Sequence, residues 1–84
     1  MVNYSSEQLR SPAYYKHYKG TQYLVLGCST HTETGEKLVV YRTEDPTPVY
    51  WTRPLAMFLE EVILPDGSKT PRFTFVKWGS RFES

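Results

Sequence analysis

The chain has 84 residues, with ten Lys and Arg against nine Asp and Glu, so its formal net charge is +1. This length accommodates one domain. The charge balance argues against a dedicated nonspecific nucleic-acid binder, because such a protein carries a strong positive field. Seven Tyr, four Phe and two Trp are a large share for so small a chain, and they indicate an aromatic-rich core or an aromatic-lined groove.

The sequence also predicts where the protein works. Cys28 is the single cysteine, so no disulfide can form within the chain, which fits a reducing cytoplasm. No apolar run approaches the roughly 20 residues that cross a membrane. The first residues lack the charged start and apolar stretch of a signal peptide. We therefore expect a soluble cytoplasmic protein without membrane contact.

Residues 1–12 form a polar N-terminal arm, in which Ser5 or Ser6 can cap one helical turn that ends before Pro12. A frayed arm is the alternative. Aromatic content predicts a strand over residues 13–19, and residues 22–32 form the clearest strand. Gly27 in its middle predicts a bulge or bend. Alternation places Leu26 and Cys28 together on the expected core face of that strand.

A hairpin connection over residues 33–36 leads into a strand over residues 37–43, whose apolar run predicts a central position with both faces buried. Residues 44–48 are acidic and proline-rich and predict a loop, because proline cannot continue a hydrogen-bonded ladder. A strand follows over residues 49–52.

A short helix is expected next, with Pro54 at its first position and Thr52 or Arg53 as its cap. Its length is limited to about two turns because Glu60 and Glu61 would lie at the unfavourable end of the helix dipole. Residues 65–68 predict a turn, residues 71–78 a last strand and residues 79–84 a polar tail. The apolar positions at helical spacing, expected to face the core, are Leu55, Phe58, Leu59 and Val62.

Short strands, tight turns and one brief helix predict a mainly β fold over residues 13–78. We expect a small, strongly bent sheet or partly open barrel of SH3-like or OB-like size.

Several motifs carry a family resemblance. They are Tyr15-Lys16-His17-Tyr18-Lys19-Gly20, Tyr23-Leu24-Val25-Leu26-Gly27, His31-Thr32-Glu33-Thr34, Val39-Val40-Tyr41-Arg42, Trp51-Thr52-Arg53-Pro54-Leu55-Ala56-Met57-Phe58 and Pro71-Arg72-Phe73. In this order the chain resembles the domain-of-unknown-function 1653 family (DUF1653), a group of short bacterial domains, over about residues 14–75. The resemblance implies a compact single domain and no particular reaction. The chain departs from the family in residues 44–49, where family members often have a loop with glycine and aromatic residues.

His31 and Glu33 are the first candidate site, together with His17. A histidine and a carboxylate within reach can form an acid–base pair, and two histidines with Glu33 can bind a metal ion. The alternative is that His31 caps the hairpin loop while Glu33 is solvated. We expect no metal site, because no Cys or Asp completes a known ligand spacing.

The second candidate is Tyr41 and Arg42 with Trp51 and Arg53. If their strands are antiparallel neighbours, both guanidinium groups lie on one surface beside Trp51, an arrangement that suits a planar anion, a nucleobase or a phosphate. The alternative is that Trp51 is a core residue and that Arg53 pairs with Glu60 or Glu61.

Tyr15, His17 and Lys19 are secondary candidates, because aromatic and cationic residues alternate there as on a nucleic-acid surface. The alternative is an ordinary half-buried strand. Catalysis by Cys28 is not expected, since a free cysteine on a core face behaves as a small hydrophobe.

The sequence therefore favours a noncatalytic binding module for a small planar polar ligand, such as a nucleotide, a modified base or a short single strand. Its expected ligand-binding residues are His31, Glu33, Tyr41, Arg42, Trp51 and Arg53, with no catalytic residue and no cofactor. The alternatives are a protein-interaction domain and, last, a small hydrolase or lyase that uses His31 or His17 as its base. A monomer or weak homodimer is expected, with residues 14–19 or 73–78 as the pairing edge and Trp78 as its anchor.

Overall fold

The computed structural model describes residues 5–79; the outer parts of the expected arm, residues 1–4, and of the expected tail, residues 80–84, lie outside the described residues. The elements in chain order are η1 (Ser6–Gln8), β1 (Ala13–His17), β2 (Gln22–Thr30), β3 (Lys37–Arg42), β4 (Tyr50–Pro54), α1 (Leu55–Leu59), β5 (Glu61–Ile63), β6 (Lys69–Pro71) and β7 (Phe73–Trp78). The expected mainly β fold with one short helix is confirmed.

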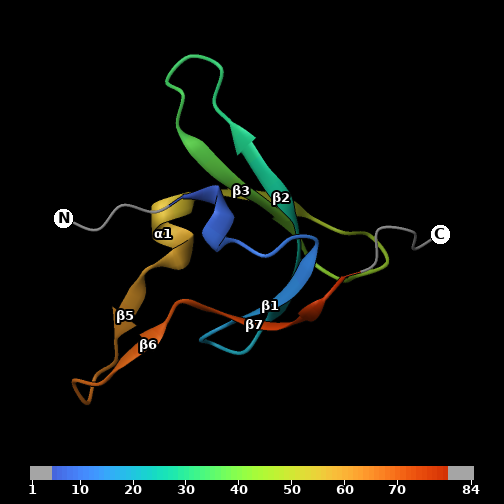
Figure 1. The fold of residues 1–84 in the computed structure, drawn as a ribbon. Coiled ribbons are helices and arrows are strands. Elements are labelled where there is room, and N and C mark those ends of the chain that lie inside the picture. Colours follow the sequence, from blue (N-terminus) through green and yellow to red (C-terminus); the bar gives the residue numbers. More distant parts are fainter. Residues whose placement is uncertain (1–4, 80–84) are drawn as a thin grey trace.

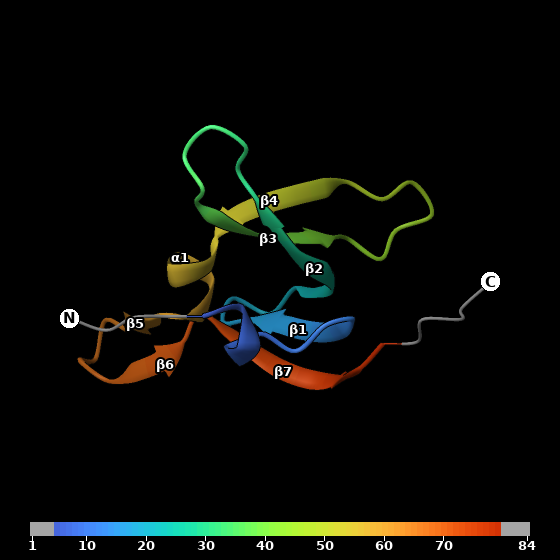
Figure 2. The ribbon, with the colours of Figure 1, turned by 45° about the horizontal axis from the view of Figure 1, so that its top comes forward.

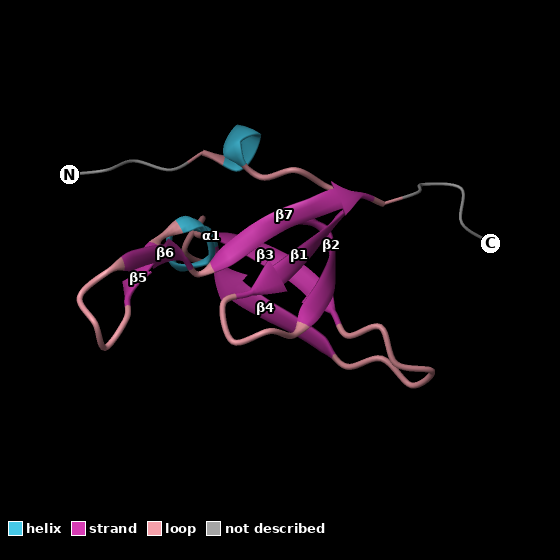
Figure 3. Ribbon diagram, turned by 90° about the horizontal axis from the view of Figure 1, so that it is seen from below, coloured by secondary structure: helices cyan, strands magenta, loops and turns pink. Residues whose placement is uncertain are grey.

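Five antiparallel strands form the larger sheet in the order β4-β3-β2-β1-β7, and β5 pairs with β6 in a separate hairpin (Figure 1). The sheet is strongly bent, so β4 and β3 lie across from β1 and β7, with α1 at one end between them (Figure 2). The edge strands β4 and β7 do not pair within residues 5–79, so the sheet is an open barrel rather than a closed one (Figure 3).

Two register shifts accompany the bend. One lies in β2 between Val25 and Gly27, as the mid-strand glycine predicted, and the other lies between β1 and β7 next to Tyr14. A bulge increases local twist and bends its strand. The first shift also moves side chains between faces: Val25 is fully buried, Leu26 is 40% exposed, and Cys28 packs against the core. The expectation that Leu26 and Cys28 share a face is therefore wrong, because simple alternation cannot count the extra residue.

β3 alternates cleanly. Val39 and Tyr41 are buried, whereas Leu38 and Val40, on the other face, are half-buried. The strand is internal in the sheet, as expected, but one face covers the core and the other is partly open to solvent. The apolar run concealed this difference, because Leu38 and Val40 are apolar on the open face too.

The short helix begins one residue later than expected. β4 continues through Pro54, whose φ of −51° and ψ of 136° are extended, and α1 starts at Leu55. Leu55 and Phe58 are buried as predicted. Val62 was expected in the helix and instead lies in β5, because Glu60 is already extended and the β-branched residues after it favour a strand. The β5–β6 hairpin was not anticipated, although its turn at residues 65–68 was.

Aromatic rings build most of the core. The rings of Phe58 and Phe73 are stacked with centroids 4.0 Å apart, and Tyr15 and Tyr41 meet Phe58 at 5.3 Å and 5.7 Å. The helix thus places Phe58 at the centre of the concave face of the sheet. The other buried members of this cluster are Leu9, Ala13, Val25, Val39 and Leu55.

The part of the arm that the structure describes is packed onto the domain. Ser5 is the N-cap of η1, as predicted, and Leu9 is 7% exposed. The backbone N–H of Arg10 donates to the Tyr15 hydroxyl at 3.0 Å, and the Arg10 guanidinium carbon lies 4.5 Å from the centroid of the Phe75 ring. Among residues 5–79, no helix is long and apolar enough to span a membrane.

Candidate functional site

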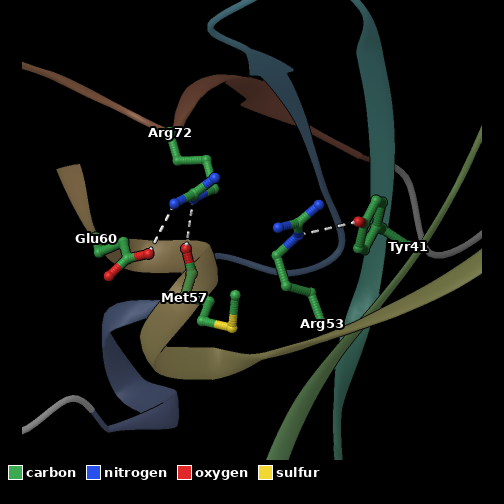
Figure 4. A network of polar contacts seen from close by, with 5 residues as sticks. All are labelled: Tyr41, Arg53, Met57, Glu60 and Arg72. Atoms are coloured by element: carbon green, nitrogen blue, oxygen red, sulfur yellow. Dashed lines mark hydrogen bonds and ion pairs between the residues drawn. The ribbon is translucent and has the colours of Figure 1, made fainter. Parts of the chain in front are cut away.

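Arg53 and Tyr41 form the centre of the candidate site. Arg53 Nε donates a hydrogen bond to the Tyr41 hydroxyl at 3.3 Å (Figure 4). In the β3–β4 ladder Arg53 is opposite Val39 and Trp51 is opposite Tyr41, so all four side chains lie on the concave face. Tyr41 is 4% exposed and Arg53 is half-buried. A buried hydroxyl therefore fixes one edge of the guanidinium group, and the two terminal nitrogens point elsewhere.

Trp51 lies two residues before Arg53 on the same face, about 6.6 Å along the strand. It is 49% exposed, so the alternative of a core tryptophan is not what the fold adopts. Trp51 is the cross-strand neighbour of Tyr41 and lies on the edge strand β4, so part of its indole is open to solvent.

Glu60 forms an ion pair with Arg72 and not with Arg53, which was its alternative partner in the sequence analysis. Arg72 Nη2 lies 2.7 Å from Glu60 Oε1, and its Nε donates to the carbonyl oxygen of Met57 at 3.0 Å (Figure 4). This residue joins the end of α1 to the segment between β6 and β7. Within residues 5–79 Arg53 is in no ion pair. Glu60, one of its two expected partners, pairs with Arg72 instead.

His17 lies close to both arginines. Its ring meets Phe73 edge-on with centroids 4.9 Å apart, and its Nδ1 accepts the backbone N–H of Lys19 at 3.2 Å. Burial, followed by the positive charges of Arg53, Lys19 and Arg72, lowers the pKa of His17 below its ordinary value of 6.5. The ring is therefore neutral at pH 7, with its proton on Nε2.

Arg42 is not part of this arrangement. It follows Tyr41 directly in β3 and pairs with Leu24 and Tyr50, so it lies on the outer face of the sheet. Its Nη1 donates to the carbonyl oxygen of Thr43 at 3.2 Å. The expectation that Arg42 and Arg53 lie on one surface is therefore wrong. Arg42 pairs with Tyr50, and Arg53 is three residues after Tyr50, so the two arginines lie on opposite faces of the sheet.

His31 and Glu33 lie in the β2–β3 connection, away from Arg53. His31 Nδ1 accepts the backbone N–H groups of Glu33 and Thr34 at 3.2 Å and 3.3 Å, and Glu33 is exposed. His31 thus caps the hairpin loop, which is the alternative that the sequence left open. Among residues 5–79, no three His, Cys, Asp or Glu side chains gather as a metal site would require.

The secondary candidates Tyr15, His17 and Lys19 lie in three different environments. Tyr15 is 5% exposed and belongs to the core, whereas Lys19 is exposed in the turn after β1 with its Nζ 5.9 Å from the centroid of the Tyr18 ring. His17 alone of the three approaches Arg53.

Comparison with known proteins decides the family. The sequence profile described as "Protein of unknown function (DUF1653)" matches residues 13–75. The chain belongs to the DUF1653 family. A crystal structure of a DUF1653 protein from Bordetella bronchiseptica is similar, with a TM-score of 0.76 and 35% sequence identity, covering 90% of this chain and 97% of that chain. A search of curated proteins finds no match.

In this DUF1653 chain, sequence reasoning missed two residues that shape the site. Arg72 and Phe73 were noted as a motif piece and as a strand residue, without a role near Arg53. Arg53 lies over Phe73, with its guanidinium carbon 5.7 Å from the ring centroid. The sequence distance of 20 residues gave no indication of this contact, which depends on how far the sheet bends.

This DUF1653 site offers hydrogen-bond donors and one flat aromatic surface. The donors are the terminal nitrogens of Arg53 and the Nε2–H of His17, and the surface is the open part of Trp51. The charge of Arg72 adds to the positive potential, although Glu60 partly neutralises it. Such a set suits an anion attached to a planar group.

Proposed function

We propose that this DUF1653 protein is a noncatalytic binding module that holds a small planar anion, such as a nucleotide or a modified base, at Arg53. One observation carries the proposal. Arg53 is oriented by the Tyr41 hydroxyl but has no carboxylate partner within residues 5–79. A half-buried, oriented guanidinium without a counter-ion is prepared to bind an anion in bidentate fashion, because little side-chain freedom remains to be lost.

The neighbouring residues have distinct roles in this proposal. Trp51 provides a stacking surface, and base stacking on an aromatic side chain contributes about 1–3 kcal/mol in single-strand binders. His17 donates from Nε2 as a neutral ring. In this proposal Arg53, Trp51 and His17 bind the ligand and none of them catalyses a reaction.

The experiment is an amide-resolved NMR titration of the labelled protein with pooled nucleosides, nucleotides and common metabolites. We expect shifts concentrated on residues 17, 51 and 53, and saturable binding of one ligand class. Arg53→Lys retains the charge but loses the fork, so we expect it to weaken binding at least about tenfold. Trp51→Ala should weaken it by a similar factor.

Thr52→Ala is the matched control, because Thr52 is exposed on the opposite face of the same strand. It should bind as the wild type does. If Arg53→Lys and Trp51→Ala both retain wild-type affinity while their spectra stay well dispersed, the assigned site is wrong.

A second candidate function is a protein-interaction domain, favoured by the open edge of β4. Tyr50 and Trp51 in β4 are 62% and 49% exposed, and Val49 just before the strand is 48% exposed; within residues 5–79 β4 pairs on one side only. Extended peptides add to such edges by backbone pairing. A nuclease-resistant, stoichiometric partner that Val49→Lys no longer captures would favour this function over ligand binding, since a lysine on an edge discourages strand addition.

A further inference from the structure

The charges of this protein are separated by structural element. The five strands of the larger sheet contain five cationic residues and no Asp or Glu. The acidic residues among residues 5–79 lie instead in η1, in the loops, after α1 and in the β5–β6 hairpin. The cationic residues of the sheet are Lys16, Lys37, Arg42, Arg53 and Lys77. A net charge of +1 therefore conceals a basic sheet.

Three of these cations share the outer face, which is the face opposite the core. Cross-strand partners form a continuous row over all five strands: Lys77 pairs with Tyr14, Tyr14 with Leu24, Leu24 with Arg42 and Arg42 with Tyr50. Lys16 lies on the same face, two residues after Tyr14, and is exposed. Neighbouring strands are about 4.8 Å apart, so the row extends about 19 Å along the sheet.

Cations and aromatic rings alternate along this row. Lys77 Nζ lies 5.2 Å from the centroid of the Tyr14 ring, Arg42 is half-buried, and Tyr50 is 62% exposed at the β4 end. Leu24 between them is 6% exposed and lies outside the core cluster, so it contributes little to the accessible surface of the row. No carboxylate projects from the five strands themselves; Glu44 of the β3–β4 loop is the one carboxylate hydrogen-bonded to a side chain of this face among residues 5–79, accepting from Gln22, the cross-strand partner of Lys16, at 3.1 Å.

We propose that this outer face, comprising Tyr14, Lys16, Arg42, Tyr50 and Lys77, binds single-stranded nucleic acid. Binding sites for single strands combine cations that follow the phosphates with aromatic rings on which bases stack. Here Lys16, Arg42 and Lys77 contact phosphates, and Tyr50 stacks on a base. The face is separate from the Arg53 site, because the sheet itself lies between them.

Charge complementarity decides between this partner and a duplex or an acidic protein. A face with only three cations and one highly exposed tyrosine offers too few phosphate contacts for a duplex, whose bases are also stacked and inaccessible. An acidic protein would use the cations but would gain little from the flat face of Tyr50. Unstacked bases use both.

The test measures fluorescence anisotropy of a labelled oligouridylate of about 12 nucleotides at several salt concentrations between about 50 and 200 mM. Three phosphate contacts predict that log Kobs falls with log salt with a slope near about −2, since each contact on a single strand contributes about −0.7. Lys16→Gln and Lys77→Gln should each reduce the steepness by about 0.7.

Lys69→Gln is the matched control, because Lys69 is an exposed lysine in β6, off the larger sheet. It makes the same change in net charge and should leave the slope unaltered. Tyr50→Ala should weaken binding at least about fivefold through lost stacking. Tyr18→Ala, at a tyrosine 38% exposed beyond the row, should not.

Three results would overturn the proposal: no saturable binding at the lowest salt, equal effects of Lys69→Gln and Lys77→Gln, or stronger binding of a poly-glutamate peptide than of the oligonucleotide. Arg53→Lys should leave oligonucleotide binding unchanged. Loss of the small ligand and loss of the oligonucleotide are therefore distinguishable.

Discussion

The guanidinium of Arg53, on the edge strand β4, lies 5.7 Å from the ring centroid of Phe73, on the opposite edge strand β7. Three strands, β3, β2 and β1, lie between these two strands in the sheet order, so the contact exists because the sheet bends until its edges approach at this end. Phe73 also stacks on Phe58 and meets His17 and Tyr41. The candidate site and the core therefore share one aromatic ring.

Phe58 should be the most sensitive core position. It is 1% exposed and stacks on Phe73 at 4.0 Å. Phe58→Ala is expected to lower the free energy of unfolding by about 3–5 kcal/mol, because it removes buried area and leaves a cavity. Urea unfolding followed by circular dichroism measures this. Met57→Ala, at a neighbouring side chain 43% exposed, is the control and should cost far less.

Folding stability should depend on the protonation of His17. Its pKa is lowered by burial and by Arg53, Lys19 and Arg72, so between the folded pKa and the unfolded value of 6.5 the unfolded chain binds a proton that the folded protein does not. The unfolding free energy therefore rises with pH through this window. Stability from His17 should be fully present above about pH 6.5 and should be lost as the pH falls through the folded pKa.

Urea unfolding at several pH values should show this slope in the wild type and a flatter dependence in His17→Gln. The lowered pKa of Asp66, held down by its hydrogen bonds to Ser68, acts in a separate window below its ordinary value of 3.8. An identical slope in both proteins between about pH 5 and 7 would contradict the assignment to His17.

Arg72 should anchor the end of α1 through its fork rather than its charge alone. Its Nε reaches the Met57 carbonyl and its Nη2 reaches Glu60. Arg72→Lys cannot make both contacts, so we expect it to cost about 1 kcal/mol. Glu60→Gln keeps a hydrogen-bond acceptor on a 41% exposed side chain and should cost less than about 1 kcal/mol. A loss in Glu60→Gln without any loss in Arg72→Lys would show that only the ion pair matters.

Two adjacent apolar residues of β2, on either side of the sheet, should differ in sensitivity. Val25 is fully buried, whereas Leu26 is 40% exposed. Leu26→Gln should change the unfolding free energy by no more than about 0.5 kcal/mol, while Val25→Ala should lower it by at least about 1 kcal/mol. Thermal unfolding of the two variants compares them directly. The reverse order would mean that Leu26, rather than Val25, faces the core in solution.

Much of the fold could be predicted because local chemistry determines it. The aromatic strands, the Gly27 bulge, the turn at residues 65–68 and the buried pair Leu55 and Phe58 all follow from residue type and spacing. The β5–β6 hairpin was missed because Val62 also satisfies helical spacing. Its strand state involves pairing with β6 and the contact of Arg72 with Glu60, 12 residues apart along the chain.

The candidate site was harder to predict than the fold. That Tyr41, Trp51 and Arg53 share a face follows from pairing two antiparallel strands in one particular register, and a different register would have brought Arg42 there instead. The proximity of His17 and Phe73 depends on the curvature of the whole sheet. Residue spacing in the sequence determines neither the register of β3 with β4 nor the curvature of the sheet.

Each edge of the open barrel carries one cation within its strand, Arg53 in β4 and Lys77 in β7. An uncharged β4 would be a flat run of tyrosine, tryptophan and threonine with free backbone groups, which is the kind of segment that recruits further strands into aggregates. Arg53 points inward from that edge, and an extended intermolecular sheet would have to bury its charge. We therefore expect the residue that we assign to a ligand also to oppose aggregation through the β4 edge.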